Sequence, residues 1–293
     1  MTGTYFWRGG KNINSPMFDV AGAGVEKVVQ PDGSIKIMSG SDTKQNKDAM
    51  AWHRKAYLNG WIPKDVLTIQ YNKDVFKNGQ AACVYGSVNP DQAKLEADWG
   101  KVYTVDIGDT NWLTADMVSG SATSISFNSK NKERAMMLIE LADTDPEIFN
   151  NLILGVEGKH WVRKDKNQWD YAPGVNDTNS GYKMTSMGWA IGNDFIKFTK
   201  VGTDPNTPKK IQAFDKSAKA EPAIGFVPDL TPYKTQIANM GNVYNEIGIS
   251  LYLGVVDPAK YFDECNKKYV KAGINDVVAG VQKQFNDYLA ANK

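Results

Sequence analysis

The stretch that decides the fold is Gly225–Lys293, which reads GFVPDLTPYKTQIANMGNVYNEIGISLYLGVVDPAKYFDECNKKYVKAGINDVVAGVQKQFNDYLAANK. A Gly-Phe pair precedes a loop bounded by prolines, and a helix is predicted to follow it. The chain then restarts at a Gly-Val-Val-Asp-Pro sequence and ends in a helix with Lys, Gln, Asn and Asp on one face. None of these residues forms a catalytic pattern, so this part of the chain indicates a structural or binding role.

The composition excludes several classes of protein. A chain of 293 residues, with 42% hydrophobic residues, is long enough for two lobes or one large domain with a buried core. The net charge is +1, which gives no electrostatic reason to expect nucleic acid or an anionic membrane surface as a partner. No apolar run reaches the roughly 20 residues that a membrane-spanning helix needs. The two cysteines are expected to be free, with Cys83 buried as a small hydrophobic residue.

Local patterns predict several elements. Residues 25–38 read as two short strands around a Pro-Asp-Gly-Ser turn, in which the proline fixes one φ and Gly33 permits a positive one. Residues 43–59 are typical of a helix that stops at Gly60. Within DVFKNGQAACVYGSVNP, residues 74–90, we expect a buried strand over Ala81–Tyr85 that ends at Gly86-Ser87.

Two further stretches have a more specific pattern. Residues 119–145, SGSATSISFNSKNKERAMMLIELADTD, predict a strand of small residues followed by a helix. The apolar stripe of that helix is predicted to contain Ala135, Met136, Ile139 and Ala142. Asp145-Pro146 is typical of the start of the next helix, with aspartate as the cap and proline in the first turn. That helix leads into LILGVEGKHW, residues 152–161.

With these motifs, the chain resembles the extracellular solute-binding proteins of ABC importers. It is similar to the lipoprotein branch whose members end in a small domain of unassigned function. The resemblance is strongest over residues 119–161 and 225–284. It implies an α/β class and a two-lobe periplasmic-binding-protein-like (type 2) fold, with the ligand held between the lobes.

The resemblance also implies a division of the chain into segments. Residues 1–112 are expected to form most of the second lobe, and residues 113–224 to return to the first lobe through the hinge region. Residues 225–293 are expected to pack back on the second lobe as a helical segment. The start, MTGTYFWRGGKN, has no signal-peptide pattern, and the family has a large part of the first lobe upstream of it. We therefore expect the chain to be a fragment, or a short gene product, with an incomplete N-terminal lobe.

The candidate ligand contacts are mainly aromatic. Sugars present flat C–H faces and rings of hydroxyls, so their sites combine aromatic plates with polar side chains. Several of the eight tryptophans stand in polar, loop-like contexts. Each of the aromatic residues could equally be part of the core. The predicted ligand-binding residues are Trp7, Arg8, Tyr85, Ser87, Trp112, Trp189 and Asn193.

No catalytic or metal-binding motif is present in the sequence. It contains two histidines, which are far apart, and no paired Cys-x-x-Cys, acidic calcium loop, phosphate loop or nucleophile elbow. Within the LILGVEGKHW motif, Glu157 and His160 are expected to be structural, tying a loop to a helix end. We therefore predict that the protein is not an enzyme and uses no metal or cofactor.

The resemblance implies that the protein captures a carbohydrate, in particular an oligosaccharide, by lobe closure and delivers it to the permease subunits of an ABC transporter. It also implies an extracellular, cell-surface location through a lipid anchor that this sequence does not contain. One alternative is a peptide-binding or structural lipoprotein with the same fold, and another is a glycan-active enzyme or carbohydrate-binding module. A third is that the chain alone binds nothing, in which case an exposed apolar face would cause self-association.

Overall fold

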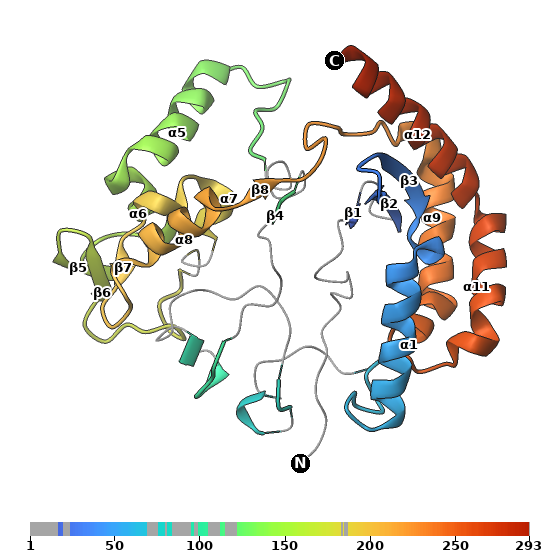
Figure 1. Ribbon diagram of the computed structural model, residues 1–293. Coiled ribbons are helices and arrows are strands. Elements are labelled where there is room, and N and C mark those ends of the chain that lie inside the picture. Colours follow the sequence, from blue (N-terminus) through green and yellow to red (C-terminus); the bar gives the residue numbers. More distant parts are fainter. Residues whose placement is uncertain are drawn as a thin grey trace. The chain divides into compact units, whose positions relative to one another are not determined.

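A computed structural model describes residues 17–19, 24–68, 76–79, 81–83, 95–96, 99–104, 112–114, 122–182, 184 and 187–292. These residues fall into two compact units, each described here by itself (Figure 1). Unit 1 takes the described residues of 1–87, 99–115 and 219–293, and unit 2 takes those of 88–98 and 116–218. The predicted assignment of three segments to the lobes of a longer protein stays a prediction.

Unit 1 begins with an antiparallel sheet of β1 (Met17–Asp19), β2 (Val25–Val29) and β3 (Ile35–Ser39), in that order. Val25 pairs with Ser39 and Val29 with Ile35, which leaves Gln30–Ser34 as the turn. Gly33 has a φ of +81°, and Asp32 accepts a hydrogen bond from the Ser34 amide. The predicted hairpin is thus confirmed.

A one-turn 3-10 helix, η1 (Gly40–Asp42), leads from this sheet to α1 (Lys44–Leu58). The Thr43 side chain caps α1 by accepting a hydrogen bond from the Asn46 amide. Helix α1 ends next to Gly60, which has a φ of +71°. The predicted helix over residues 43–59 is therefore confirmed.

The remainder of unit 1 is helical. After η3 (Thr231–Tyr233), α9 (Lys234–Val243), the π-helical turn η4 (Tyr244–Gly248) and α10 (Ile249–Tyr252) follow one another without a break. Asp257 caps α11 (Pro258–Ala272), and Gly273, with a φ of +100°, separates α11 from α12 (Ile274–Ala291). Helices α9, α11 and α12 pack against one another (Figure 1).

The main core of unit 1 lies between the sheet and the last helix. Helix α12 packs against β2 and β3, and an edge-to-face contact joins Phe226 to Phe285, with ring centroids 5.0 Å apart. The burial of these apolar side chains is the main driving force for the folding of unit 1. The core contains Val25, Ile37, Phe226, Met240, Ile274, Val277, Val281 and Phe285.

Helix α12 also satisfies the free edge of the sheet. The Gln282 side-chain oxygen accepts a hydrogen bond of 2.8 Å from the Ile37 amide on β3. Two residues further along the helix, the Gln284 amide group both accepts from the Asp229 amide and donates to the Asp229 carbonyl. These side chains replace the hydrogen bonds that a neighbouring strand and turn would supply.

Unit 2 contains α5 (Lys132–Thr144), α6 (Pro146–Leu154), α7 (Gly188–Ile191), η2 (Asp194–Ile196) and α8 (Thr207–Lys216). Its sheet has the order β5 (Trp161–Asp165), β6 (Gln168–Tyr171) and β7 (Thr199–Lys200). Asp145 caps α6 with Pro146 in its first turn, as predicted. The core of the unit consists of Phe149, Ile153, Leu154, Trp161, Trp169 and Phe198.

A short parallel pair of strands lies where the chain passes between the units. Trp112 of β4 (Trp112–Leu113) pairs with Lys219 of β8 (Lys219–Ala220), and both strands belong to unit 1. In sequence, β4 precedes the long excursion into unit 2, and β8 follows directly after it. These two strands are therefore the unit 1 ends of the connections to residues 116–218.

Several expectations need correction. Residues 122–131 form no strand, although a strand of small residues is predicted at the start of the stretch 119–145. Residues 81–83 are not part of a strand, although Ala81 is buried, and Cys83 is exposed and not buried as predicted. In α5, only Ala142 of the predicted apolar stripe is buried, while Met136 is 54% exposed.

Among the described residues, no helix is both long and apolar enough to cross a membrane.

Candidate functional site

The structure describes three of the seven predicted ligand-binding residues. Trp112 belongs to unit 1, whereas Trp189 and Asn193 lie on one short segment of unit 2. The other four residues lie outside the described residues; they are Trp7, Arg8, Tyr85 and Ser87. The segment around Trp189 is the place where the structure brings predicted residues together.

Trp112 stands on β4, at the unit 1 end of a connection. Its side chain is half-buried, and its backbone is paired with Lys219 of β8. The next residue, Leu113, accepts a hydrogen bond of 2.9 Å from the Glu221 amide, which extends the pairing by one residue. Trp112 therefore has a fixed backbone at the position where the sequence predicted a crossing between lobes.

Trp189 has an exposed side chain on a backbone segment that is closely packed against unit 2. It lies on α7, and 59% of its surface is accessible to solvent. The flanking Gly188 is buried, and a Cβ there would lie 2.3 Å from the Asp194 carboxylate and 3.2 Å from the Phe149 ring. A Cβ at Gly192 would lie 2.5 Å from the Ala142 carbonyl oxygen of α5. The two glycines thus let α7 pack closely on unit 2 while the indole stays accessible.

Asn193 holds this segment in place. Its side-chain oxygen accepts a hydrogen bond of 3.0 Å from the Phe195 amide, and its side-chain nitrogen donates to the Asp143 carbonyl at 3.1 Å. The first bond caps η2, and the second ties the segment to the end of α5. These contacts give Asn193 a structural role, and a contact between Asn193 and a ligand stays a prediction.

Trp189 is not isolated as an exposed apolar side chain. Helix α7 ends at Ile191, and only some of the apolar residues between 189 and 198 reach the core. Phe198 is buried, whereas Phe195 remains 44% exposed. Helix α8 packs against η2, and its Phe214 is also exposed. Unit 2 therefore has three accessible aromatic side chains on α7, η2 and α8.

The LILGVEGKHW motif is structural, as predicted for His160. The His160 Nδ1 atom accepts a hydrogen bond of 2.9 Å from the Val156 amide, and its ring stacks on Tyr182 at 5.5 Å. The buried Trp161 donates from its indole nitrogen to the Gly155 carbonyl at 2.9 Å. Both interactions close the turn between α6 and β5. Glu157 forms an ion pair of 3.6 Å with Arg163, which agrees with a structural role.

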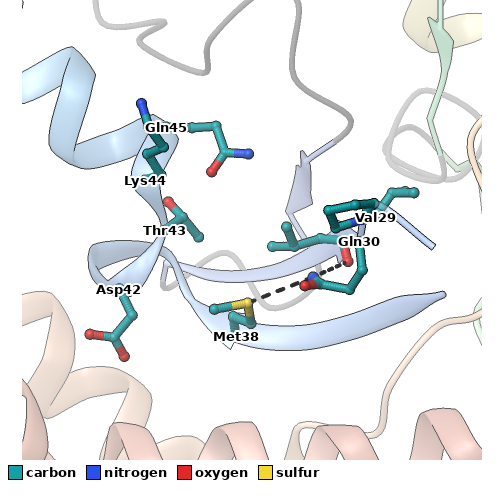
Figure 2. A pocket seen from close by; sticks show the side chains of 9 residues that line it. Val29, Gln30, Met38, Asp42, Thr43, Lys44 and Gln45 are labelled. Carbon is teal, nitrogen blue, oxygen red and sulfur yellow. Dashed lines mark hydrogen bonds between the residues drawn. The ribbon is translucent and has the colours of Figure 1, made fainter. Parts of the chain in front are cut away.

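A hollow of about 420 Å³ lies in unit 1, between the β2–β3 turn and the start of α1 (Figure 2). Several of its polar groups already have partners in the protein. The Gln30 amide donates to the Val28 carbonyl and contacts the Met38 sulfur, and the Lys44 ammonium pairs with Asp48 at 2.5 Å. The lining contains no aromatic residue and none of the predicted site residues. It is therefore a poor candidate for a sugar site.

The described residues contain no group of His, Cys, Asp or Glu side chains arranged to hold a metal ion. The pKa values of His53 and Cys265 are shifted, and both shifts have structural causes. Burial lowers the pKa of His53, which contacts Trp52 and Tyr252 by its ring. Burial also raises the pKa of the Cys265 thiol to about 11. Neither residue belongs to the segment around Trp189.

The chain is similar to several known proteins. Residues 222–290 match a family model described as a domain of unknown function (DUF3502). The chain is 28% identical over 295 residues to a carbohydrate ABC transporter substrate-binding protein of Streptococcus pneumoniae serotype 4. That alignment covers 96% of this chain and 58% of the relative.

Solved structures give the fold. The N-glycan transport solute-binding protein NgtS of Streptococcus pneumoniae superposes with a TM-score of 0.78 at 23% identity. This chain has the solute-binding protein fold. The superposition covers 100% of this chain and 65% of NgtS. NgtS in complex with Man5GlcNAc gives a TM-score of 0.71 at 23% identity, with 99% and 64% covered.

These findings confirm the resemblance that the motifs indicated. The match over residues 222–290 coincides with the predicted C-terminal domain of unassigned function. The chain spans less than two thirds of the length of these relatives, with 58% and 65% covered.

Sequence reasoning missed one feature near the connections. Lys27 and Glu221 form an ion pair of 2.8 Å in which both side chains are almost fully buried. In the sequence, Lys27 lies in a predicted strand that reads VEKVV, and Glu221 precedes a proline. No local signal links two residues that are 194 positions apart.

Proposed function

We propose that this chain is part of an ABC-importer solute-binding protein that captures a carbohydrate, specifically an oligosaccharide, and delivers it to membrane permease subunits. The fold supports the proposal, because the superposition with NgtS reaches a TM-score of 0.78. The names of the relatives support the ligand class, since they describe carbohydrate and N-glycan transport. In this proposal the protein has no chemical step, no cofactor, and an extracellular location at the cell surface.

The observation that carries the ligand class within this chain is the exposed indole of Trp189. An accessible aromatic plate on a rigid base suits the apolar face of a sugar ring, because it loses little conformational entropy when it stacks. The glycines on both sides of Trp189 and the hydrogen bonds of Asn193 supply that rigidity. We propose Trp189 as a stacking contact, with Trp112 as a second contact at the connection.

The proposal is tested by thermal shift and isothermal titration with Man5GlcNAc, a linear maltooligosaccharide and a short peptide. A ligand that binds only the folded protein raises its melting temperature. Binding of an oligosaccharide, with the affinity reduced about tenfold by Trp189→Ala, would support the proposal; tenfold corresponds to about 1.4 kcal/mol. The matched control is Trp61→Ala, which removes an indole of similar exposure (43%) in unit 1 and should leave the affinity unchanged.

The same experiment decides between the alternatives. A shift with the peptide alone would replace the sugar proposal with a peptide-binding protein on the same fold. Cleavage of the oligosaccharide, detected by mass spectrometry of the mixture, would indicate a glycan-active enzyme. An equal loss of affinity in the Trp189 and Trp61 variants would remove Trp189 from the site.

A further inference from the structure

We infer that the buried Lys27–Glu221 ion pair anchors the two segments of unit 1 that flank residues 116–218, the longer stretch of unit 2. Both residues are thereby positioning residues for the movement of the units. The inference rests on the proposed function for its biological role, because lobe closure is the movement that such an anchor would serve. Its structural part concerns unit 1 alone and can be tested without a ligand.

The pair lies in the interior of unit 1. The Lys27 ammonium and the Glu221 carboxylate are 2.8 Å apart, and their side chains are 2% and 1% exposed. Lys27 is on β2, the central strand of the three-stranded sheet, so its backbone is held by pairing with β1 and β3. The fixed end of the ion pair is therefore on the most constrained strand of the unit.

Glu221 contacts both segments that flank residues 116–218. It directly follows β8, the segment by which the chain returns from unit 2. Its amide donates a hydrogen bond of 2.9 Å to the Leu113 carbonyl on β4, the segment by which the chain leaves unit 1. One residue thus binds the outgoing segment through its backbone and the sheet through its side chain.

The chain immediately after Glu221 is held as well. The Lys27 ammonium lies 3.5 Å from the Ala223 carbonyl oxygen. Ala223 has a φ of +56°, a conformation that is unfavourable for alanine and needs support from its surroundings. The Phe226 amide donates to the same carbonyl at 2.9 Å, and Phe226 enters the main core. Residues 221–226 therefore have fixed positions relative to the sheet.

Stability alone does not account for an ion pair in this position. Two charges lose their hydration on burial, so an apolar pair of similar volume commonly gives equal or greater stability. What an apolar pair lacks is a directional bond that fixes Glu221 relative to Lys27. This difference separates an anchor from a purely stabilising contact, and the experiment uses it.

The test is amide hydrogen exchange of the wild-type chain and of the double variant Lys27→Met/Glu221→Leu. In the wild type, the amide of Glu221 should exchange no more than tenfold faster than the amides of β2. In the double variant, exchange over residues 219–223 and at the amides of β4 should rise at least tenfold. Exchange in β5 and β6 of unit 2 should not change. The control variant Lys268→Met/Glu246→Leu removes an exposed ion pair and should leave residues 219–223 unaffected.

A charge-swapped variant, Lys27→Glu/Glu221→Lys, restores opposite charges and should bring back slow exchange at residues 219–223. Unchanged exchange in the apolar variant would overturn the inference. So would wild-type exchange of the Glu221 amide a hundredfold faster than that of β2. The wild-type comparison remains decisive if the variants do not fold.

Titration with Man5GlcNAc separates this inference from the proposed function. Weaker binding by the apolar variant, with wild-type binding by the Lys268→Met/Glu246→Leu control, would support a positioning role in ligand capture. If the wild type binds no oligosaccharide, the proposed function fails, whereas the anchor is still supported or overturned by the exchange data.

Discussion

Gly155 and His160 approach each other so closely that any other residue at position 155 would collide with the imidazole. A Cβ on Gly155 would lie 2.4 Å from the His160 Nδ1 atom, the atom that accepts the hydrogen bond from the Val156 amide. Gly155 also has a φ of +85° and a ψ of −153°, a combination open almost only to glycine. The turn between α6 and β5 depends on this contact.

We therefore expect Gly155→Ala to lower the free energy of unfolding by about 3 kcal/mol, from the combined cost of the backbone conformation and the collision. Chemical denaturation followed by tryptophan fluorescence measures this loss. The control is Gly158→Ala in the same turn, where φ is +80° but no atom lies within 4 Å of the added carbon. It should cost only about 1 kcal/mol. Equal losses in the two variants would contradict the role of the collision.

Stability should depend on pH through His53. Burial lowers the pKa of His53, partly offset by a hydrogen bond with the Tyr252 backbone. The folded protein therefore binds the proton less readily than the unfolded chain, whose histidine pKa is about 6.5. The contribution to stability is complete above about pH 6.5 and is lost as the pH falls below that value, by up to about 1.4 kcal/mol per pH unit.

His53→Phe, which keeps a ring between Trp52 and Tyr252, should reduce this dependence. Unfolding free energies measured from pH 7.5 to pH 5.5 check the prediction. The other histidine, His160, is present in both proteins. The same slope in the wild type and in His53→Phe would show that His53 is not the source.

The two cysteines should differ in reactivity. Both are free, and Cys83 is exposed, whereas Cys265 is buried. Desolvation raises the pKa of both thiols, and it raises that of Cys265 to about 11. Because the thiolate is the reactive form, Cys265 should resist a thiol reagent in the native protein. Ellman's reagent should modify one cysteine in buffer and both in guanidinium chloride, and Cys83→Ser should abolish the native reaction. Fast modification of Cys265 in the native state would disprove the burial.

The exposed apolar surface of α5 should cause self-association of this chain. Met136, Met137 and Leu138 are each more than half exposed, and Leu141 is 37% exposed. Contiguous apolar surface of this kind favours association in water. Light scattering at increasing concentration should show particles larger than a monomer, and Met137→Lys/Leu138→Lys should reduce them. Glu140→Lys, which changes the charge but removes no apolar side chain, is the control. A monomeric wild type at high concentration would count against the prediction.

Local sequence signals predicted those parts of the fold that local interactions determine. The β2–β3 hairpin follows from its Pro-Asp-Gly-Ser turn, and the start of α6 follows from its Asp-Pro cap. The segment around Trp189 could be predicted only in part. The sequence marks Trp189 as an aromatic residue that could be a ligand contact or part of the core, and only the structure shows that α7 ends after four residues with the indole exposed.

Long-range polar contacts escaped prediction because their partners are distant in sequence. Lys27 would ordinarily be assigned to the solvated side of a strand, yet Glu221 makes its burial possible. Gln284 lies on the polar face of the final helix, yet its amide group binds both backbone groups of Asp229. Such pairs emerge only after the core has brought their elements together.

The core shared by α12 and the first sheet has a consequence for how the carboxy-terminal family region is understood. The family model begins at residue 222, but Val277, Val281 and Phe285 of that region are buried against Val25 and Ile37, which precede it by almost two hundred positions. Residues 222–290 are therefore half of a folding unit and not a separable module. If these residues were transferred alone to another protein, they would lack the first sheet, against which the apolar face of α12 packs.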